Sequence, residues 1–455
     1  MSDWWHEKCA LFGVFGHPEA SNLTYLGLYA QQHRGQEGAG IISLDEKGLH
    51  VYKKKGLVAD VFSEEVLMRL SGFAAIGHTR YSTYGSKDVE NLQPMLFSAC
   101  KKELAIAHNG SILNYPSIKA MLMEKGIKTT TSVDSEVFGH LINVYNGLEI
   151  SESFYKIMKA VHGAYSVLVL TGHSILAFRD PFGFRPLCIG KLNNASVIAS
   201  ESCAFDLIGA EFVSEVKPGE VVEISKDGIK RYRIVDLHRH AKCIFELVYF
   251  SRPDSYVFGK NVYKTRKALG AKLFQEFHVN ADIIVPVPDS GVPAAIGFHE
   301  ASSIPFEMAL IRNHYVGRTF IEPKQSIRSF GVKIKLNPVR GAVDGKSIVL
   351  VDDSLVRGTT LRKITTLLRN NGAREIHVRI TSPHVVSPCY FGIDTPSKEE
   401  LLASKIGHQQ IADFIGSDSI SYLSVEGMLE ACKMDAKESC TACFTGNYPL
   451  MFESQ

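Results

Sequence analysis

The stretch Ile348–Thr360, with the sequence IVLVDDSLVRGTT, constrains the fold more than any other part of the chain. Its four leading apolar residues predict a short strand that is buried on both faces of a parallel sheet. Two adjacent carboxylates, Asp352 and Asp353, follow where this strand should end. Apolar residues with helical spacing come next and stop at Gly372, and a further apolar run at 376–380 predicts another strand. The predicted unit is therefore strand, loop, helix, strand.

A unit of this kind presents its ligand at the carboxyl ends of the strands. Backbone N–H groups and hydroxyls at a helix start suit a phosphate, and two carboxylates suit a sugar diol or the water shell of Mg²⁺. Helix capping needs only one carboxylate, so capping alone does not account for the pair. The string resembles the phosphoribosyl diphosphate (PRPP) motif of type I phosphoribosyltransferases. This resemblance implies that PRPP binds to Asp352, Asp353, Arg357, Gly358, Thr359 and Thr360.

A second strand-to-helix turn, at 282–297, carries Asp289 and Ser290 directly after the run DIIVPVP. Asp and Ser at such a turn are typical of plain helix capping. Family members place a serine at this position, so the resemblance implies that Ser290 contacts pyrophosphate or Mg²⁺. The expected magnesium residues are then Ser290, Asp352 and Asp353.

The totals of the sequence limit the class of protein. A chain of 455 residues is long enough for two or three domains. A net charge of +2 argues against a nucleic-acid or membrane-surface partner held by bulk charge. No window reaches the roughly 18–20 apolar residues of a membrane span, and the start MSDWWHEK lacks the apolar core of a signal peptide. Nine scattered cysteines favour a reduced, cytoplasmic protein over a disulfide framework.

The two halves of the chain differ in pattern. In the first half, Cys9 opens an apolar run that predicts a buried strand, and residues 22–34 have helical spacing. From 164 to 235, three pairs of apolar runs flank turn residues, which predicts hairpins and an antiparallel sheet. After about residue 236, strand and helix patterns alternate, as expected for a parallel α/β domain.

Polar clusters lie between the predicted strands of the first half, and each has a plain structural explanation when it is taken alone. An Asn-Gly pair is typical of a turn, Asp134 is a reasonable helix cap, and a lone buried cysteine is usually a small apolar residue. Their order is more informative. Cys9 with its strand, then QHRGQ, GHTRYS, AHNG and SVDSE, resembles the glutaminase domain of the N-terminal-nucleophile amidotransferases. The resemblance implies an αββα sandwich of two antiparallel sheets.

The chemistry of glutamine hydrolysis fits these residue types, because acyl transfer needs a nucleophile, a base and oxyanion stabilisation. If residues 1–8 are a propeptide that is removed, the free α-amine of Cys9 becomes a base within reach of its thiol. The resemblance implies the remaining roles. Asn109 and the N–H of Gly110 would form the oxyanion hole, and Arg34 would lie close to the nucleophile. Arg80 would bind the α-carboxylate of glutamine and Asp134 its α-amine.

A basic segment at 312–337 shows little periodicity and carries Arg318, Lys324, Arg328, Lys333 and Lys335. Segments of this length are usually disordered loops or functional lids. Cationic side chains are suited to closing over a pyrophosphate leaving group. In the phosphoribosyltransferase family this segment is the loop that orders on PRPP binding, so a closing loop is expected here.

Together, the halves resemble the glutamine phosphoribosylpyrophosphate amidotransferases, and the resemblance extends from residue 9 to about 449. It implies a propeptide at 1–8, a glutaminase domain at 9–236 and a phosphoribosyltransferase domain at 237–455. The expected reaction is the first committed step of purine synthesis. Glutamine, PRPP and water give 5-phospho-β-D-ribosylamine, glutamate and pyrophosphate, with ammonia passing through an internal channel. The alternatives are a glutamine amidotransferase with another acceptor and a PRPP-binding regulatory protein.

Four cysteines fall outside both predicted reaction centres: Cys243, Cys389, Cys440 and Cys443. Only the last two form a CxxC pair, for which a zinc site is an equal interpretation from spacing alone. The residues around all four resemble the iron–sulfur, Bacillus-like subtype of the family, which implies a structural [4Fe–4S] cluster. The same resemblance implies a homotetramer that is inhibited by purine nucleotides.

Overall fold

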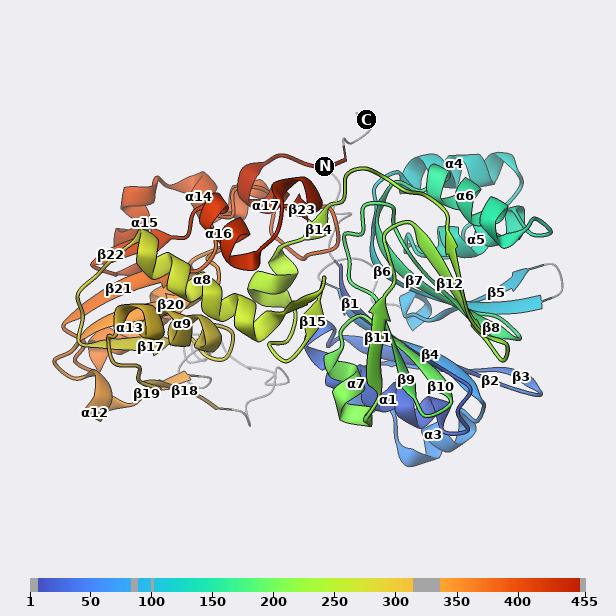
Figure 1. Ribbon diagram of the computed structural model, residues 1–455, viewed down its shortest axis with the longest axis horizontal. Helices are drawn as coiled ribbons and strands as arrows, with labels where there is room; N and C mark the ends of the chain where they lie inside the picture. Colours follow the sequence, from blue (N-terminus) through green and yellow to red (C-terminus); the bar gives the residue numbers. More distant parts are fainter. Residues whose placement is uncertain (1–6, 83–88, 100–101, 314–335, 451–455) are drawn as a thin grey trace.

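The computed structural model describes residues 7–82, 89–99, 102–313 and 336–450, and within them the first half of the chain forms two stacked antiparallel sheets (Figure 1). The seven-stranded sheet has the order β11-β9-β10-β1-β4-β2-β3, and the six-stranded sheet has the order β13-β12-β8-β7-β6-β5. The strands of the first sheet are β1 (Glu7–Phe15), β2 (Gly38–Asp45), β3 (Gly48–Lys55), β4 (Ala74–Ser82), β9 (Cys188–Leu192), β10 (Ala195–Ala199) and β11 (Glu211–Glu215). Those of the second are β5 (Met95–Ala99), β6 (Lys102–Ile112), β7 (Gly163–Leu170), β8 (Ser174–Arg179), β12 (Glu220–Ser225) and β13 (Gly228–Arg233).

Three apolar layers hold this half together, because strand side chains alternate between the two faces of a sheet. In β1, Leu11 and Phe15 pack between the sheets, whereas Phe12 and Val14 face the outer helices. The outer helices on the first sheet are α1 (Ala20–Ala30), η1 (Gln32–Arg34), α2 (Val58–Val61), α3 (Glu64–Arg69) and α7 (Cys203–Ile208). Those on the second are α4 (Tyr115–Glu124), α5 (Glu136–Val144) and α6 (Ile150–Ala160). The arrangement is the predicted αββα sandwich.

The second half is built on a parallel sheet in the order β17-β20-β21-β22, as counted over the described residues. Its strands are β17 (Ile283–Pro286), β20 (Ser347–Asp352), β21 (Glu375–Ile380) and β22 (Ser419–Tyr422). Apolar residues of α8 (Val262–Glu276), α9 (Val292–Ser302) and α16 (Val425–Cys432) cover one face. Those of α12 (Arg340–Val343), α13 (Thr359–Asn370) and α15 (His408–Ile415) cover the other. Burial on both faces explains why β20 is a continuous apolar run.

Short elements connect the halves and complete the second one. They are β14 (Lys242–Cys243), the π-helix η3 (Glu246–Phe250), β15 (Tyr256–Val257), β16 (Lys260–Asn261), β18 (Leu310–Arg312), β19 (Leu336–Pro338), η4 (Lys398–Glu400), α14 (Leu402–Lys405), η5 (Ala436–Glu438), β23 (Ser439–Cys440) and α17 (Ala442–Thr445), with η2 (Val89–Asn91) in the first half. Strand β14 pairs with β23, so the end of the chain returns to the junction between the halves (Figure 1).

The predicted hairpins and the helix after Gly358 are confirmed: β7 pairs with β8, β9 with β10, and β12 with β13, while α13 begins at Thr359. The basic segment gave no strand signal, yet its ends pair as β18 and β19. Residues 314–335 lie outside the described residues, as do the five cationic side chains expected in the closing loop. Most of the expected propeptide, residues 1–6, also lies outside them.

Candidate active sites and a four-cysteine site

Three of the predicted glutaminase residues lie on the inner faces of the sandwich, as the period of two in a strand requires. Cys9 shares the parity of Leu11 in β1, and Asn109 shares that of Ala107 in β6; Leu11 and Ala107 both pack between the sheets. Arg80 is the register partner of Cys9 on β4. Cys9 and Asn109 are fully buried. The cysteine thiol and the amide are therefore held on opposing inner walls of one structure.

The geometry at Asn109 and Gly110 leaves an unfilled hydrogen-bonding position. Among the described residues, neither Nδ2 nor Oδ1 of the buried Asn109 has a hydrogen-bond partner. Buried amides are rarely left unsatisfied, and a ligand that completes them is a common reason. Gly110 has φ of +147°, and a Cβ there would lie 2.0 Å from the carbonyl oxygen of Ala164. Only glycine fits at this position of β6, because any side chain would clash with the main chain of β7.

Asp134 lies beside the same end of β6. Its Oδ2 accepts a hydrogen bond of 2.8 Å from the Ile112 N–H, and its Oδ1 lies 3.7 Å from His108 Nδ1. The loop before it is fastened by Glu136, whose carboxylate accepts hydrogen bonds from the main-chain N–H groups of residues 130 and 131 at 2.6 and 2.8 Å. Asp134 is thus held at the end of β6, where its carboxylate bonds to the main chain two residues beyond Gly110.

Arg34 contacts the nucleophile directly through the main chain. Its Nε donates a hydrogen bond of 3.1 Å to the carbonyl oxygen of Cys9. The guanidinium is fully buried between the carboxylates of Glu201 and Glu246. Burial acts to lower the pKa of Arg34, but the negative charges of Glu246 and Glu201 outweigh it and raise that pKa, so the cation is stable here. Neither carboxylate was predicted, because the residues around Glu201 and Glu246 do not indicate that either acid would pair with Arg34.

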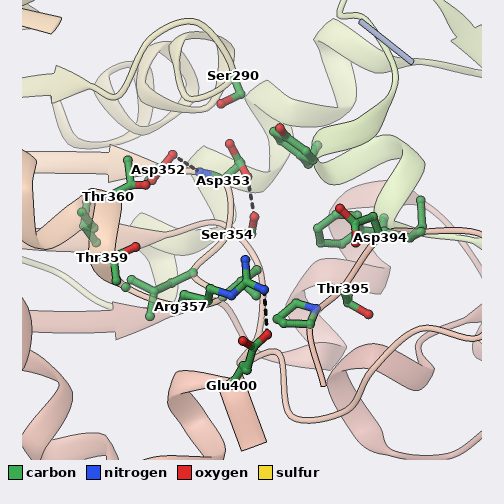
Figure 2. A pocket seen from close by; sticks show the side chains of 18 of the residues that line it. Ser290, Asp352, Asp353, Ser354, Arg357, Thr359, Thr360, Asp394, Thr395 and Glu400 are labelled. Atoms are coloured by element: carbon green, nitrogen blue, oxygen red, sulfur yellow. Dashed lines mark hydrogen bonds and ion pairs between the residues drawn. The ribbon is translucent and has the colours of Figure 1, made fainter. Parts of the chain in front are cut away.

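The PRPP motif lines a cavity of about 840 Å³ at the carboxyl end of β20 (Figure 2). Its wall includes every residue assigned to PRPP or magnesium, namely Ser290, Asp352, Asp353, Arg357, Gly358, Thr359 and Thr360. Gly358 has φ of +73° and directly precedes α13, and Gly358 and the first residues of α13 line the cavity, where a helix start is suited to an anion. In Figure 2 the two aspartates lie on one side and Arg357 pairs with Glu400 at 2.7 Å on another. The cavity offers both anion-binding and cation-binding walls.

The two aspartates are held in an unfavourable arrangement without a ligand. Burial raises the pKa of Asp352, and the neighbouring charge of Asp353 raises it further. Burial also raises the pKa of Asp353, against hydrogen bonds from Ser290 and Ser354 and the charge of Arg266. Two ionised carboxylates at this edge need hydroxyl donors or a cation. A ribose diol and a hydrated Mg²⁺ both meet that need, so the residues fit the group that the motif implies.

The four predicted cluster cysteines gather at the junction of the halves, and we call Cys243, Cys389, Cys440 and Cys443 the four-cysteine site. Cys243 and Cys440 are register partners in β14 and β23, and all four thiols are free. Burial raises the pKa of Cys443, and the charges of the other three thiolates raise it further. The Arg185 guanidinium acts in the opposite direction on Cys243, Cys389 and Cys440. The sulfurs therefore share one electrostatic environment.

An all-sulfur set of this kind suits an iron–sulfur cluster or zinc. Within the part of the chain that the structure describes, no three or more His, Cys, Asp or Glu side chains are arranged as a metal-binding group. The four cysteines are therefore not arranged as a ligand set in this structure, and what they share with such a site is their donor type and the mutual repulsion of their thiolates. Over the same residues, no helix has the length and apolarity needed to cross a membrane.

Comparison with known proteins agrees with the two halves of the fold. The chain matches the family model for a glutamine amidotransferase domain over residues 78–206 and the model for a phosphoribosyl transferase domain over residues 254–382. It is 46% identical to the amidophosphoribosyltransferase of Bacillus subtilis, over 98% of this chain and 94% of that protein. It is also 46% identical to the Methanocaldococcus jannaschii amidophosphoribosyltransferase, over 97% of both chains. Identity with the chloroplastic amidophosphoribosyltransferase 1 of Arabidopsis thaliana is 48%, over 98% of this chain and 79% of that protein.

Two solved structures share the whole fold. One, described as the allosteric regulatory enzyme of purine biosynthesis, superposes with a TM-score of 0.93 at 46% identity and covers 98% of this chain and 97% of its own. The other is the glutamine PRPP amidotransferase of B. subtilis complexed with ADP and GMP, with a TM-score of 0.92, 46% identity and 97% of both chains covered.

The fold and the two sites define a class of enzyme in which a glutamine amidotransferase domain is joined to a phosphoribosyltransferase domain. Full-length identity of this degree assigns the family. The chain belongs to the amidophosphoribosyltransferases, which transfer the amide nitrogen of glutamine to PRPP in purine biosynthesis. The predicted fold class and activity are confirmed. A different acceptor and a purely regulatory PRPP-binding protein are both disfavoured.

Proposed function

We propose that Cys9 is the nucleophile that attacks the side-chain amide of glutamine, releases ammonia and forms a thioester that water hydrolyses to glutamate. The buried amide of Asn109 and the N–H of Gly110 stabilise the oxyanion, which supplies the partner that the Asn109 side chain lacks. Arg80 and Asp134 hold the α-carboxylate and the α-amine of glutamine. In the unprocessed chain the nitrogen of Cys9 belongs to the peptide bond with Lys8 in β1, so it cannot act as a base. Removal of residues 1–8 converts it to a free α-amine that can.

In the second centre, ammonia attacks C1 of PRPP and pyrophosphate leaves. We propose that Thr359, Thr360 and the start of α13 bind a phosphate, while Asp352 and Asp353 hold the ribose diol. Together with Ser290, the aspartates would also hold Mg²⁺, which when bound offsets negative charge on the diphosphate. No protein nucleophile is needed at this centre, so its residues orient PRPP and exclude water.

One contact between the halves carries the proposal that the two centres work together. A Cβ on Gly392 would lie 3.1 Å from the Cα of Gly110, so the chain after Cys389 packs on the proposed oxyanion glycine. The next residues, Ile393 to Thr395, line the PRPP cavity. A short stretch of main chain thus connects the two centres.

The test is glutamate release by anaerobically purified protein, with and without PRPP and Mg²⁺. We expect PRPP to raise the rate strongly and pyrophosphate to appear in an amount equal to glutamate. Glutamate formation at an unchanged rate, without pyrophosphate, would show that the centres are not coupled through PRPP. A sample whose N-terminus is verified as Cys9 by mass spectrometry is the control for incomplete processing.

For the four-cysteine site we propose a structural [4Fe–4S] cluster, with zinc as the alternative that its donor set also allows. Replacing Cys440 with alanine should abolish the broad visible absorbance of an iron–sulfur protein. It should also lower the thermal unfolding midpoint, because a bound cluster stabilises only the folded chain. The measurements are the absorbance spectrum, iron and zinc content, and thermal unfolding.

Cys432→Ala is the matched control, because Cys432 is a buried thiol outside the four-cysteine site. It should keep colour and metal content. A colourless wild-type protein with about one zinc per chain would favour zinc. A wild-type protein that contains no metal and has the same unfolding midpoint as the Cys440 variant would contradict both forms of the proposal.

The remaining assignments are also proposals. We place the domain boundary near residue 236, after β13, and the protein in the cytoplasm, which suits its free thiols. Inhibition by purine nucleotides is supported by the ADP and GMP in the similar B. subtilis structure. A homotetramer is proposed from the family resemblance.

A further inference from the structure

Glu246 is a carboxylate with no exposed surface, and it lies between two equally buried guanidinium groups. It accepts hydrogen bonds from Arg34 at 2.8 and 3.1 Å and lies 2.6 Å from Nη2 of Arg185. The hydroxyl of Ser251 donates a further bond of 2.6 Å. Both arginines also lie over the ring of Phe250, at 4.2 and 5.3 Å. Breaking ion pairs that are buried this fully would leave an uncompensated charge, so the Glu246 carboxylate is fixed in position.

The pairing fastens the main chain that carries the nucleophile. Arg34, which Glu246 orients, donates its Nε hydrogen to the carbonyl oxygen of Cys9. Two residues further along the same strand, the carbonyl of Leu11 accepts a bond of 3.1 Å from the Gln31 side chain. The Gln31 oxygen in turn accepts from the main chain of Glu201, the other carboxylate on Arg34. Glu246 and Glu201 are therefore the two carboxylates that orient Arg34, which in turn bonds to the main chain of β1.

Glu246 belongs to an element that also contributes to the PRPP cavity. It begins η3, the π-helix whose neighbouring residue Phe245 and member Tyr249 line that cavity. π-Helical turns are rare and occur frequently at functional sites. Arg266 of α8 holds both ends of the element, donating to the carbonyl oxygens of Leu247 at 3.0 Å and Ser251 at 2.6 Å. The same short element thus contacts the cavity on one side and the arginine behind Cys9 on the other.

We propose that Glu246 is a positioning residue of the glutaminase centre, supplied from beyond the glutaminase sheets, and that it transmits the occupancy of the PRPP cavity to Cys9. PRPP that packs against Phe245 and Tyr249 shifts or stiffens η3, and Glu246 passes this change through Arg34 to the Cys9 carbonyl. The inference rests on the proposed function of both centres. Glu246 touches no reacting atom, so it acts on the glutaminase through Arg34 alone.

The experiment replaces Glu246 with glutamine, which keeps the shape of the side chain but removes its charge. Three quantities are measured for each protein: the KM and kcat for glutamine hydrolysis, the ratio of glutaminase rates with and without PRPP, and ammonia-dependent synthesis. We expect E246Q to lose at least tenfold of the PRPP stimulation, while ammonia-dependent synthesis stays within about twofold. Glu246→Asp, which retains the charge, should recover a substantial part of the stimulation.

Glu220→Gln is the matched control. Glu220 is a buried acid of the glutaminase half that accepts bonds from Arg231 at 3.0 Å and from the Lys217 N–H at 2.8 Å, away from η3. It should keep the wild-type stimulation ratio. If E246Q fails to fold, Ser251→Ala removes one donor to Glu246 and should lower the ratio by a smaller factor.

The outcomes separate this inference from the proposed function. A wild-type protein without PRPP-stimulated, pyrophosphate-linked glutaminase activity would overturn the proposed function itself. A normal wild-type protein with E246Q behaving like the control E220Q would overturn only the role of Glu246. Equal losses in the glutamine-dependent and ammonia-dependent reactions would also overturn it, because they would indicate a general structural role.

Discussion

Cys9→Ala should abolish glutamine-dependent synthesis and leave ammonia-dependent synthesis close to the wild-type rate. Loss of a covalent nucleophile removes the acyl-transfer route, and losses of about 10⁴-fold or more in kcat are typical of such changes. The substitution removes one buried sulfur at the inner wall of the sandwich and leaves Arg34 its main-chain acceptor, the Cys9 carbonyl. The PRPP cavity is lined by other elements and should be unaffected. Glutamate release and phosphoribosylamine formation from ammonium chloride are the two measurements.

The control for a buried thiol in the same half is Cys188→Ala. The Cys188 thiol donates to the Ala199 carbonyl at 3.3 Å between the paired strands β9 and β10 of the same sheet and has no place in the proposed chemistry. It should retain both activities apart from a modest loss of stability. If Cys9→Ala lost ammonia-dependent synthesis as well, with an unchanged unfolding midpoint, the division into two separate centres would be wrong.

The site could be predicted from the sequence where its residues are consecutive in the chain and follow the end of a strand. The run that contains Asp352 and Asp353 predicted a buried strand, its carboxyl end and the following helix, because hydrophobic period, charge and helix start agree locally. The alternation of side chains along β1 and β6 could likewise place Cys9 on the same strand face as Leu11, and Asn109 on the same face as Ala107. It could not show that the two faces oppose each other, since that depends on how the sheets stack.

Long-range partnerships were beyond such reasoning. Arg34 and Glu246 are 212 positions apart and meet only because η3 folds back onto the glutaminase sheets. The apolar run around Glu246, IFELVYF, gives no indication of which side chain its carboxylate would pair with. The contact of Gly392 with Gly110 is of the same kind, since it joins a loop beside Cys389 to a strand of the other half. Coupling between the centres is therefore a property of the tertiary structure that the motifs alone do not reveal.

Replacing both Asp352 and Asp353 with asparagine should abolish PRPP turnover with either nitrogen source while a basal glutaminase activity remains. The double change keeps the shape of the cavity edge but removes the charge that would hold the ribose diol and Mg²⁺. Pyrophosphate formation should fall by at least about 10³-fold, the scale seen when groups that orient a reacting centre are lost. Glutamate release without PRPP should stay near the wild-type basal rate, because the glutaminase residues belong to other strands. Pyrophosphate release at the wild-type rate would remove the assigned role of both residues.

Stability provides an independent check on the same variant, and the sign of the effect is set by the pKa shifts. Burial, with the charge of Asp353, raises the pKa of Asp352 above its ordinary value of 3.8, so its ionised form destabilises the folded chain. The protonated Asp352 side chain favours the folded chain, so its contribution to stability is complete at low pH. This contribution is lost as the pH rises through the raised pKa of Asp352 in the folded chain. Without ligands at neutral pH, the double variant should therefore unfold at a higher temperature than the wild type, and the difference should disappear at acidic pH. Asp282→Asn, which changes an exposed carboxylate paired with Arg374 at 3.3 Å, should show no such gain. A double variant less stable than the wild type at neutral pH would mean that the two carboxylates hold the loop together, and its loss of PRPP turnover would then need that structural explanation.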